Sequence, residues 1–220
     1  KLGAQCDIGA WSFDAGKTVI AGEGGMITTN NRELYLLARE YHDHGHMSNE
    51  ALPRGKDTHR IHGFNYRMTE IQAVIAKVQL QKLDYIVKKN RENYSIIEST
   101  LIKIKGVKLR KIPSKCKPLC DTIIIQFPTK VVANSFVSRL QSEGLGTKNV
   151  PDAIEWHFVK YWDHMLSHFE LNADELNKSV ESSSQILEKC VALPIMVKTS
   201  SREINRQASI LKNIIHSILT

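Results

Sequence analysis

The residues best suited to chemistry lie near the start of the chain, in the stretch Ser12-Phe-Asp-Ala-Gly-Lys-Thr-Val-Ile-Ala-Gly-Glu-Gly-Gly25. Lys17 stands among small residues and is followed by a glycine-rich turn, so a bound group can approach the backbone closely. The ε-amine of a lysine is a nucleophile when desolvation or a nearby cation keeps it neutral, and it then forms a Schiff base with an aldehyde. The alternative is a surface lysine in a turn, because the stretch lacks the full spacing of a phosphate-binding loop.

A second candidate is the polar segment from His42 to Phe64, which holds five of the nine histidines. Loops this long are either functional or disordered. Neutral imidazoles at alternate positions, as in His42, His44 and His46, can converge on zinc, which is one interpretation of the cluster. His59 and His62 lie in the same polar loop, and we expect them to face solvent or a substrate.

The elements that must position these residues begin with two short strands. The pattern from Asp7 to Phe13 predicts one strand, and Gly25 to Thr29 predicts a second that forms a hairpin-like pair with it. Side chains alternate across a strand, so we expect Trp11 and Phe13 to pack in the core while Ser12 faces the site.

Helices follow the strands in the first part of the chain. Asn31 predicts the cap of a helix that runs to about Tyr41. Thr69 and Gln72 form a capping box that opens a long helix, with a break expected near Asn90 and a helical pattern that continues to about residue 102.

The second part of the chain alternates strand and helix. Thr122 to Phe127 contains an Ile-Ile-Ile run typical of a buried strand, and the following helix, Thr129 to Ser142, is closed by Gly144. A last helix is expected after a second capping box at Ser200 and Glu203. The chain therefore divides near residue 101 into a helix-rich part and an α+β part.

Composition excludes several classes of protein. The chain has 220 residues, of which 42% are hydrophobic and 24% charged, an ordinary globular mixture. Its apolar runs stop short of the roughly 18 residues needed to span a bilayer, so we expect no membrane span. The four cysteines show no zinc spacing, since Cys116 and Cys120 are four residues apart, and we expect reduced thiols in the cytoplasm and no metal site.

The formal net charge of +7 comes from one segment. Residues 103–117 contain seven Lys or Arg and no Asp or Glu, so the rest of the chain is formally neutral. A nucleic-acid module usually adds aromatic residues or a recognisable reading element, which this stretch lacks. We therefore interpret it as a solvated strand edge, where lysines discourage edge-to-edge pairing, rather than as an RNA- or anion-binding strip.

Three ordered motifs resemble one protein family. The Ser12–Gly25 stretch is similar to the Schiff-base segment of the DegT/StrS family of pyridoxal-phosphate-dependent sugar aminotransferases, and Asp43-His-Gly-His46 is similar to the family's Asp-His-Gly turn. Gly63-Phe-Asn-Tyr-Arg-Met-Thr-Glu-Ile-Gln-Ala73 differs from the family's Gly-Tyr-Asn-Tyr-Arg-Met-Thr-Glu-Ile-Gln-Ala at one position. The likeness covers about the first 95 residues and weakens beyond them.

The resemblance implies an α/β fold of the aspartate aminotransferase type (fold type I). Residues 1–100 are expected to be the C-terminal part of the large, cofactor-binding domain, and residues 101–220 a smaller α+β domain. The active sites of the family are shared across a dimer, so a homodimer is expected, with no nucleic acid and no membrane as partner.

The resemblance also implies roles for individual residues. Lys17 is the expected Schiff-base lysine, which then moves a proton between substrate and cofactor. Ser12 is expected to donate to the phosphate of pyridoxal 5'-phosphate, and Asn65 to reach the phosphate in the neighbouring subunit, although Asn65 is alternatively a simple turn residue. Arg67 and, from the small domain, His157 are expected to contact substrate. The family's His-Gly turn holds no metal, which argues against zinc at the histidines.

The expected activity is transfer of an amino group from an amino acid, with glutamate the expected donor, to a keto sugar. The family takes the carboxylate at the pyridine nitrogen and the aromatic ring that stacks on the cofactor from residues before the Ser-Phe strand, and Asp7 matches a different position. The chain therefore resembles only the C-terminal portion of such an enzyme, and the isolated chain is expected to be inactive. The alternative is a non-catalytic module for dimerisation or ligand binding.

The sugar itself is not fixed by the motifs. Specificity in the family lies in loops, and the loop from Met47 to His62 carries Pro53-Arg-Gly-Lys-Asp57, whose Arg and Lys suit an anionic substrate. Its context resembles the branch that aminates carbon 8 of the octulosonate sugar of lipopolysaccharide, the 8-amino-3,8-dideoxy-octulosonate transaminases, which would place the enzyme in lipopolysaccharide biosynthesis.

Overall fold

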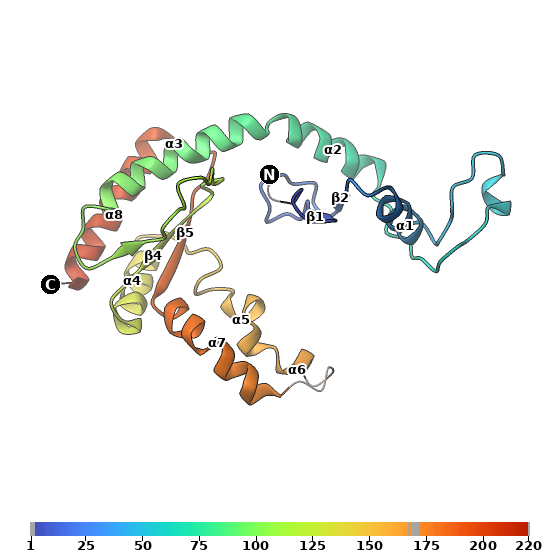
Figure 1. Cartoon of the computed structure of the whole chain (residues 1–220). Coiled ribbons are helices and arrows are strands. Elements are labelled where there is room, and N and C mark those ends of the chain that lie inside the picture. Colours follow the sequence, from blue (N-terminus) through green and yellow to red (C-terminus); the bar gives the residue numbers. More distant parts are fainter. Residues whose placement is uncertain (1–2, 167, 169–171, 220) are drawn as a thin grey trace. The chain divides into compact units, whose positions relative to one another are not determined.

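The structure is a computed structural model that describes residues 3–166, 168 and 172–219 (Figure 1). The chain forms two compact units, Lys1–Asp84 and Tyr85–Thr220. The division falls earlier than the domain boundary expected near residue 100, and the assignment of a large-domain part and a small domain stays a prediction. Within the described residues, no helix combines the length and the apolar character that a membrane span requires.

The first unit contains a hairpin and two helices. Strands β1 (Gly9–Ser12) and β2 (Gly25–Thr28) pair antiparallel, with Gly9 opposite Thr28 and Ser12 opposite Gly25, as the sequence predicts. Helix α1 (Arg32–His42) follows, then a long loop with one 3-10 turn, η1 (Arg54–Lys56), and helix α2 (Glu70–Gln81).

Local signals explain where these helices begin. The Asn31 side chain accepts hydrogen bonds from the backbone N–H groups of Glu33 (2.9 Å) and Leu34 (3.3 Å), which satisfies two of the free donors at the start of α1. Thr69 and Gln72 form the predicted capping box at the start of α2.

The second unit is built on a three-stranded antiparallel sheet in the order β3-β4-β5, formed by β3 (Lys108–Leu109), β4 (Thr122–Gln126) and β5 (Cys190–Pro194). Helix α3 (Leu83–Leu101) leads into this unit, and α4 (Lys130–Ser142) and α8 (Ser201–Leu219) lie side by side (Figure 1). The smaller elements are α5 (Ile154–His157), η2 (Val159–Tyr161), α6 (Asp163–Leu166) and α7 (Ala173–Leu187).

A hydrophobic core fills the second unit. Ile123 and Ile125 of β4, Phe136 and Leu140 of α4 and Ile215 of α8 have no exposed surface. The alternation of buried and half-buried residues along β4 shows that one face of the sheet meets this core. Apolar side chains of α3, α4 and α8 therefore bury one another against the sheet.

Two expectations about local structure are wrong. The helical segment is interrupted at Lys82 and not near Asn90. Asn90 and Asn93 instead lie buried within α3, where the Asn93 amide donates to the carbonyl of Met196 (3.0 Å), so the helix continues through them. Trp11 was expected in the core, but it is 41% exposed and donates its indole N–H to the Thr28 hydroxyl (3.0 Å).

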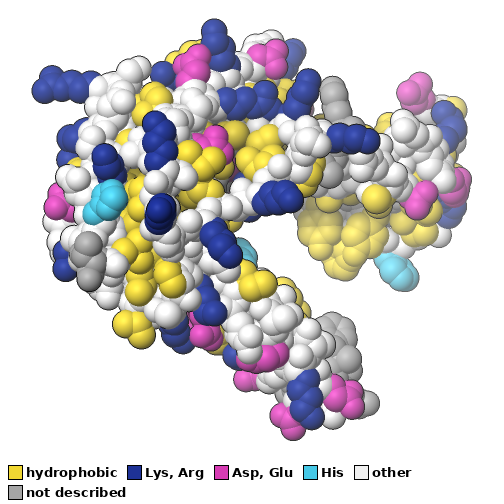
Figure 2. All heavy atoms as spheres, turned by 60° about the vertical axis from the view of Figure 1, so that its left-hand side comes forward, with side chains coloured by type: hydrophobic (Ala, Val, Ile, Leu, Met, Phe, Trp, Pro, Cys, Tyr) yellow, Lys and Arg dark blue, Asp and Glu magenta, His cyan; other side chains and the backbone are white. Residues whose placement is uncertain are grey.

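The basic segment contains the edge strand that its lysines predict. β3 pairs only with β4 in the described sheet, so Lys108 stands at the sheet's edge, while Ile104 is buried and Ile112 packs against the core. On the face shown in Figure 2, Lys and Arg side chains are scattered among polar and apolar ones. The apolar residues of the basic segment thus attach it to the core of the second unit.

Candidate active site

Lys17 lies in a tight turn directly after β1. Its backbone N–H donates to the carbonyl of Asp14 (3.0 Å), and the Asp14 carboxylate accepts from the backbone N–H of Gly16 (3.2 Å). The Lys17 Nζ atom lies 4.0 Å from Asp14 Oδ2, and 54% of the lysine side chain is exposed. The turn therefore presents a primary amine beside a carboxylate.

Ser12 ends β1 and belongs to the same turn. Its Oγ atom accepts a hydrogen bond from the backbone N–H of Asp14 (3.3 Å). A hydroxyl that accepts one hydrogen bond keeps its own proton as a donor. Ser12 can thus donate to an anionic group close to the turn that carries Lys17.

The glycine-rich turn that follows requires glycine. Gly22 and Gly24 have φ values of +84° and +131°, which side chains rarely allow. The Gly24 carbonyl accepts from the N–H of Phe13 (2.9 Å), and a Cβ atom on Gly24 would lie 2.4 Å from Cε of Met68. The first motif (Ser12–Gly25) therefore packs directly against the third motif (Gly63–Ala73), because Gly24 meets Met68, which lies 44 residues further along the chain.

The second and third motifs form one structure. Asp43 and Asn65 face each other in an isolated antiparallel bridge. Gly63 has no room for a side chain, because its Cβ atom would lie 2.6 Å from the carbonyl oxygen of Tyr41. The Asp-His-Gly turn and the Asn65 segment are consequently fixed in register against each other.

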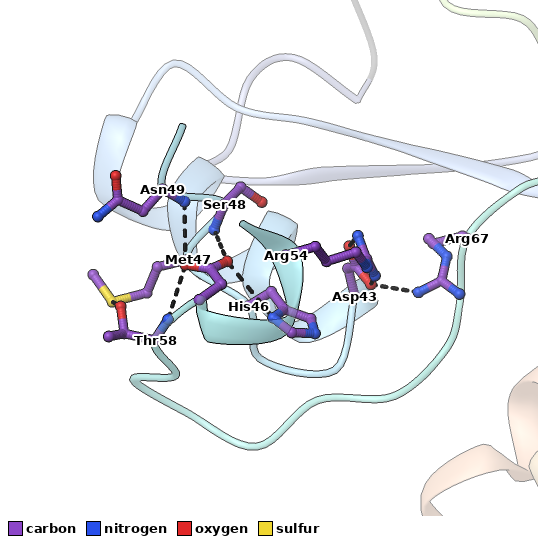
Figure 3. A network of polar contacts seen from close by, with 9 residues as sticks. Asp43, His46, Met47, Ser48, Asn49, Arg54, Thr58 and Arg67 are labelled. Carbon is purple, nitrogen blue, oxygen red and sulfur yellow. Dashed lines mark hydrogen bonds and ion pairs between the residues drawn. The ribbon is translucent and has the colours of Figure 1, made fainter. Parts of the chain in front are cut away.

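Asp43 is the centre of a charged network (Figure 3). Both carboxylate oxygens accept from the Arg54 guanidinium, at 2.7 and 3.1 Å, and Oδ1 also accepts from Arg67. The Asp43 side chain is only 11% exposed. The hydrogen bonds from Arg54, helped by Arg67 and opposed by burial, lower the pKa of Asp43 from 3.8 to about 2.

Two further carboxylates organise the long loop. Asp57 accepts from the backbone N–H groups of Ser48 (2.8 Å), Asn49 (3.2 Å) and Thr58 (2.9 Å), and these bonds lower its pKa although burial raises it. The buried Glu40 of α1 accepts two hydrogen bonds from Arg60, at 3.0 and 3.1 Å. Residues 43–67 are therefore an ordered structure attached to the end of α1.

Arg54 has a structural partner in this network. The sequence suggested that the basic side chains of the loop bind an anionic substrate, but the Arg54 guanidinium holds Asp43. Arg67, expected to contact substrate, likewise has its guanidinium on Asp43, with 40% of its side chain exposed. Its substrate role stays a prediction.

Three of the loop's five histidines, His44, His59 and His62, line one depression. The His46 and His59 rings lie 4.3 Å apart, and His44 lies 6.3 Å from His46. His44 and His59 line an open depression of about 760 Å³ together with Tyr41 and residues 60–62. Across the part of the chain that the structure describes, no group of three or more His, Cys, Asp or Glu residues is arranged to hold a metal ion.

His157 ends α5 in the second unit and is exposed. Its predicted contact with substrate stays a prediction, as do the roles of Ser12, Lys17 and Asn65. Within the first unit the structure does bring the Lys17 turn, the glycine turn and the third motif together through the contact of Gly24 with Met68.

Comparison with known proteins identifies the family. The sequence pattern of the DegT/DnrJ/EryC1/StrS aminotransferase family matches residues 1–212. The chain belongs to this family. The family that the three motifs of the first unit suggested is confirmed.

Two relatives illustrate how far the likeness reaches. An uncharacterised protein of Methanocaldococcus jannaschii is 25% identical over 224 aligned residues, which cover 98% of this chain and 55% of that protein. The GDP-perosamine synthase of Caulobacter vibrioides is 40% identical over 84 residues, or 38% of this chain and 21% of that enzyme. The chain spans about half the length of the relative that it matches throughout.

Solved structures show the same fold. An aminotransferase from Psychrobacter cryohalolentis superposes with a TM-score of 0.84 at 21% identity, covering 100% of this chain and 58% of that one. The mixed helix and strand architecture is thus that of about half of this solved aminotransferase, which confirms the predicted fold class.

The sequence analysis missed the part played by Asp43 and Glu40. Each is buried, each is paired with arginine, and each is placed by the last turn of α1. The sequence did contain one indication of their role. Both carboxylates lie close to the apolar face of a short amphipathic helix, where an ionised side chain requires a partner. Their arginines come from the loop and cannot be assigned by spacing.

Proposed function

We propose that the protein to which this chain belongs is a pyridoxal-phosphate-dependent aminotransferase that moves an amino group from an amino acid to a keto sugar. The observation that carries the proposal is the turn in which the Lys17 amine and the Ser12 hydroxyl each lie next to Asp14, beside a glycine turn in contact with the Asn65 segment. Membership of the family and the sugar aminotransferases among the relatives support it.

The residues present fit the cofactor. A primary amine suits an aldehyde, and a hydroxyl and a carboxamide that can both donate suit a phosphate. We propose that Lys17 holds the cofactor, that Ser12 donates to its phosphate, and that Asn65 donates to the phosphate bound by a second subunit. When bound, pyridoxal phosphate supplies the electron sink for the transfer.

Lys17 has a second task in this proposal. When it is not bonded to the cofactor, its amine would accept a proton from the substrate carbon and would later donate that proton again. Asp14 lies 4.0 Å away and carries the opposite charge, so it keeps the ammonium form close to the turn. The exposed lysine side chain has the freedom that such a transfer requires.

The names of several relatives support one substrate class. These names specify sugars linked to GDP, UDP or dTDP, which favours a nucleotide-linked keto sugar. The octulosonate of lipopolysaccharide, which the loop motif suggested, is the alternative acceptor, and glutamate is the proposed donor. Arg67 and His157 are the proposed contacts to the sugar.

We also propose that the enzyme is a homodimer in the cytoplasm. Asn65 is exposed, and its neighbours in sequence, Phe64 and Tyr66, have exposed rings that lie 5.5 Å apart and next to Tyr41. Exposed aromatic clusters around a polar residue are typical of interfaces. All four cysteines are free, which fits a reducing compartment.

A non-catalytic module is the competing function. It would need the fold and the exposed aromatic surface, but it has no physical use for the amine of Lys17, the hydroxyl of Ser12 and the carboxamide of Asn65 together. The three side chains therefore favour the enzyme.

The test uses the whole polypeptide that contains this sequence. Pyridoxal phosphate should produce a new absorption band in the visible or near-ultraviolet range, and borohydride should attach the cofactor covalently to Lys17, as mass spectrometry of the peptide would show. Lys17→Ala should abolish both signals, while Lys82→Ala, a matched exposed lysine, should preserve them. A whole protein that shows no band and no labelled Lys17 would overturn the proposal.

A further inference from the structure

Asp43 connects two parts of the first unit, the long loop and the Asn65 segment. It ends α1 as the helix cap, its carboxylate is nearly buried, and it accepts from one arginine of the loop and one that follows Asn65. Neither arginine is close to it in sequence, since they lie 11 and 24 residues further along.

The contacts continue from Asp43 to the Asn65 side chain. Arg67 is held by Asp43 through its guanidinium, and the backbone N–H of Arg67 donates to Oδ1 of Asn65 (3.4 Å). Because the carboxamide oxygen accepts this bond, the NH₂ group of Asn65 is the part that remains available to donate to a ligand.

The backbone supports the same arrangement. The N–H of Phe64 donates to the carbonyl of Tyr41 (2.8 Å), and the N–H of Tyr66 donates to that of His42 (2.9 Å). Asn65 therefore has its main chain fixed by α1 and its side chain fixed by Arg67, and both constraints meet at Asp43.

The charges favour this geometry. The Asp43 carboxylate pairs with both guanidinium groups, so the three side chains together carry a net charge of +1. The negative charge between Arg54 and Arg67 also reduces the repulsion between these two cations. Removing the carboxylate charge would leave the two cations without the group that brings them together.

We propose that Asp43 is a positioning residue, which through Arg67 orients the Asn65 carboxamide toward a phosphate. The inference rests on the proposed function for the identity of that phosphate, but the orientation itself is a property of this chain. Asp43 touches neither substrate nor cofactor in this proposal and acts only through its neighbours.

The chain offers a matched control. Glu40 lies one turn before Asp43 on the same helix, is also buried, and is also paired with an arginine of the loop, Arg60. Arg60 does not belong to the Asn65 segment, so Glu40→Gln removes an equivalent ion pair without releasing Arg67.

The first measurement is hydrogen exchange by mass spectrometry on the whole polypeptide without cofactor. Asp43→Asn is expected to speed exchange at least about tenfold in the peptide that contains residues 64–68. Glu40→Gln is expected to speed it in the peptide around Arg60 and to leave residues 64–68 unchanged. Unchanged exchange at 64–68 in Asp43→Asn, or equal changes there in both variants, would overturn the proposal.

The second measurement is the dissociation constant of pyridoxal phosphate. Asp43→Asn and Arg67→Met are each expected to weaken binding about tenfold, and the double variant no more than either alone, because the two residues act in one chain of contacts. Glu40→Gln is expected to keep the wild-type constant at a comparable loss of thermal stability. Additive losses in the double variant would contradict the proposed route through Arg67.

The two measurements separate this inference from the proposed function. If the wild-type protein binds no pyridoxal phosphate but Asp43→Asn still releases residues 64–68 selectively, the proposed function fails and the positioning of Asn65 stands. If the wild type binds cofactor and Asp43→Asn changes neither exchange nor affinity, the proposed function stands and the positioning role fails.

Discussion

The two units of the chain are stabilised in different ways. In Tyr85–Thr220 the described residues form a core of fully buried aliphatic and aromatic side chains. In the described part of Lys1–Asp84, the buried hydrophobic residues are only Ala21 and Ala76, while the buried polar ones are Glu40 and Asp43.

The first unit also exposes large apolar side chains. Ile71 and Val74 of α2 are 75% and 59% exposed, and Trp11 of β1 is 41% exposed. Surfaces of this kind mark places where other polypeptide packs. We expect other polypeptide to cover them. The chain spans about half the length of the proteins that it matches throughout.

The candidate chemistry therefore lies in the unit whose described residues bury almost no apolar side chains. Turns, backbone hydrogen bonds and arginine–carboxylate pairs fix Lys17, Ser12 and Asn65 locally, but such contacts contribute little net free energy. The second unit supplies burial of apolar surface, which is the dominant stabilising contribution in folded proteins.

Separating the units should give the largest effect. Residues 83–220 are expected to unfold in one cooperative transition with a free energy in the usual range of about 5–15 kcal/mol, because they contain the core. Residues 1–82 are expected to show no cooperative transition. Urea titrations followed by circular dichroism measure both, and a cooperative transition in residues 1–82 would refute the comparison.

A matched pair of leucines measures the difference residue by residue. Leu140→Ala, at a position with no exposed surface in α4, should lower the free energy of unfolding by about 3 kcal/mol. Leu80→Ala, at a position 51% exposed in α2, should lower it by less than about 1 kcal/mol. If urea unfolding of the chain shows equal losses of free energy in the two variants, Leu80 is buried to the same degree as Leu140 and the comparison fails.

The charged network predicts a pH dependence confined to the first unit. The pKa of Asp43 is lowered from 3.8 to about 2, so ionised Asp43 stabilises the fold fully above about pH 4, and this contribution disappears as the pH falls toward 2. The opening free energy of the Phe64 and Tyr66 amides should fall by about 1–2 kcal/mol over that window.

Hydrogen exchange measured between pH 2 and 4 tests this dependence. Asp43→Asn should remove it, because the amide carries no charge at either pH. Exchange of Ile125 in the sheet of the second unit serves as the control and should not follow the same curve. A dependence that persists in Asp43→Asn would assign it to another carboxylate.

The smallest effect is expected at the basic segment. Replacing Lys115 and Lys117 by Gln should change the free energy of unfolding by less than about 0.5 kcal/mol, because both are exposed. RNA binding at low salt, where phosphate contacts are strongest, should be absent in the wild type. Binding that weakens steeply with salt would reveal a function for the strip.

Much of the fold was predictable because its signals are local. The structure confirms the predicted caps at Asn31 and Thr69, the β1–β2 pair, the Ile-rich strand β4 and the helix end at Gly144. The helix break was misplaced, since burial of Asn93 against Met196 depends on residues about a hundred positions away.

The site was predictable only as a set of candidates. Spacing and family likeness selected Ser12, Lys17 and Asn65, and the turn around Lys17 follows from its Asp14 and Gly16. The importance of Asp43 was not visible, because its partners lie in a loop whose path no local pattern specifies.

Sequence patterns were sufficient to predict the family, the capped helices, the edge strand with its lysines and the residue types of the candidate site. Each of these depends on neighbours within a few positions or on ordered motifs. Only the tertiary structure decided that Gly24 meets Met68, that Arg54 and Arg67 share Asp43, and that the apolar core lies in the second unit. Burial and long-range pairing depend on how distant segments fold together, which residue type and local spacing do not encode.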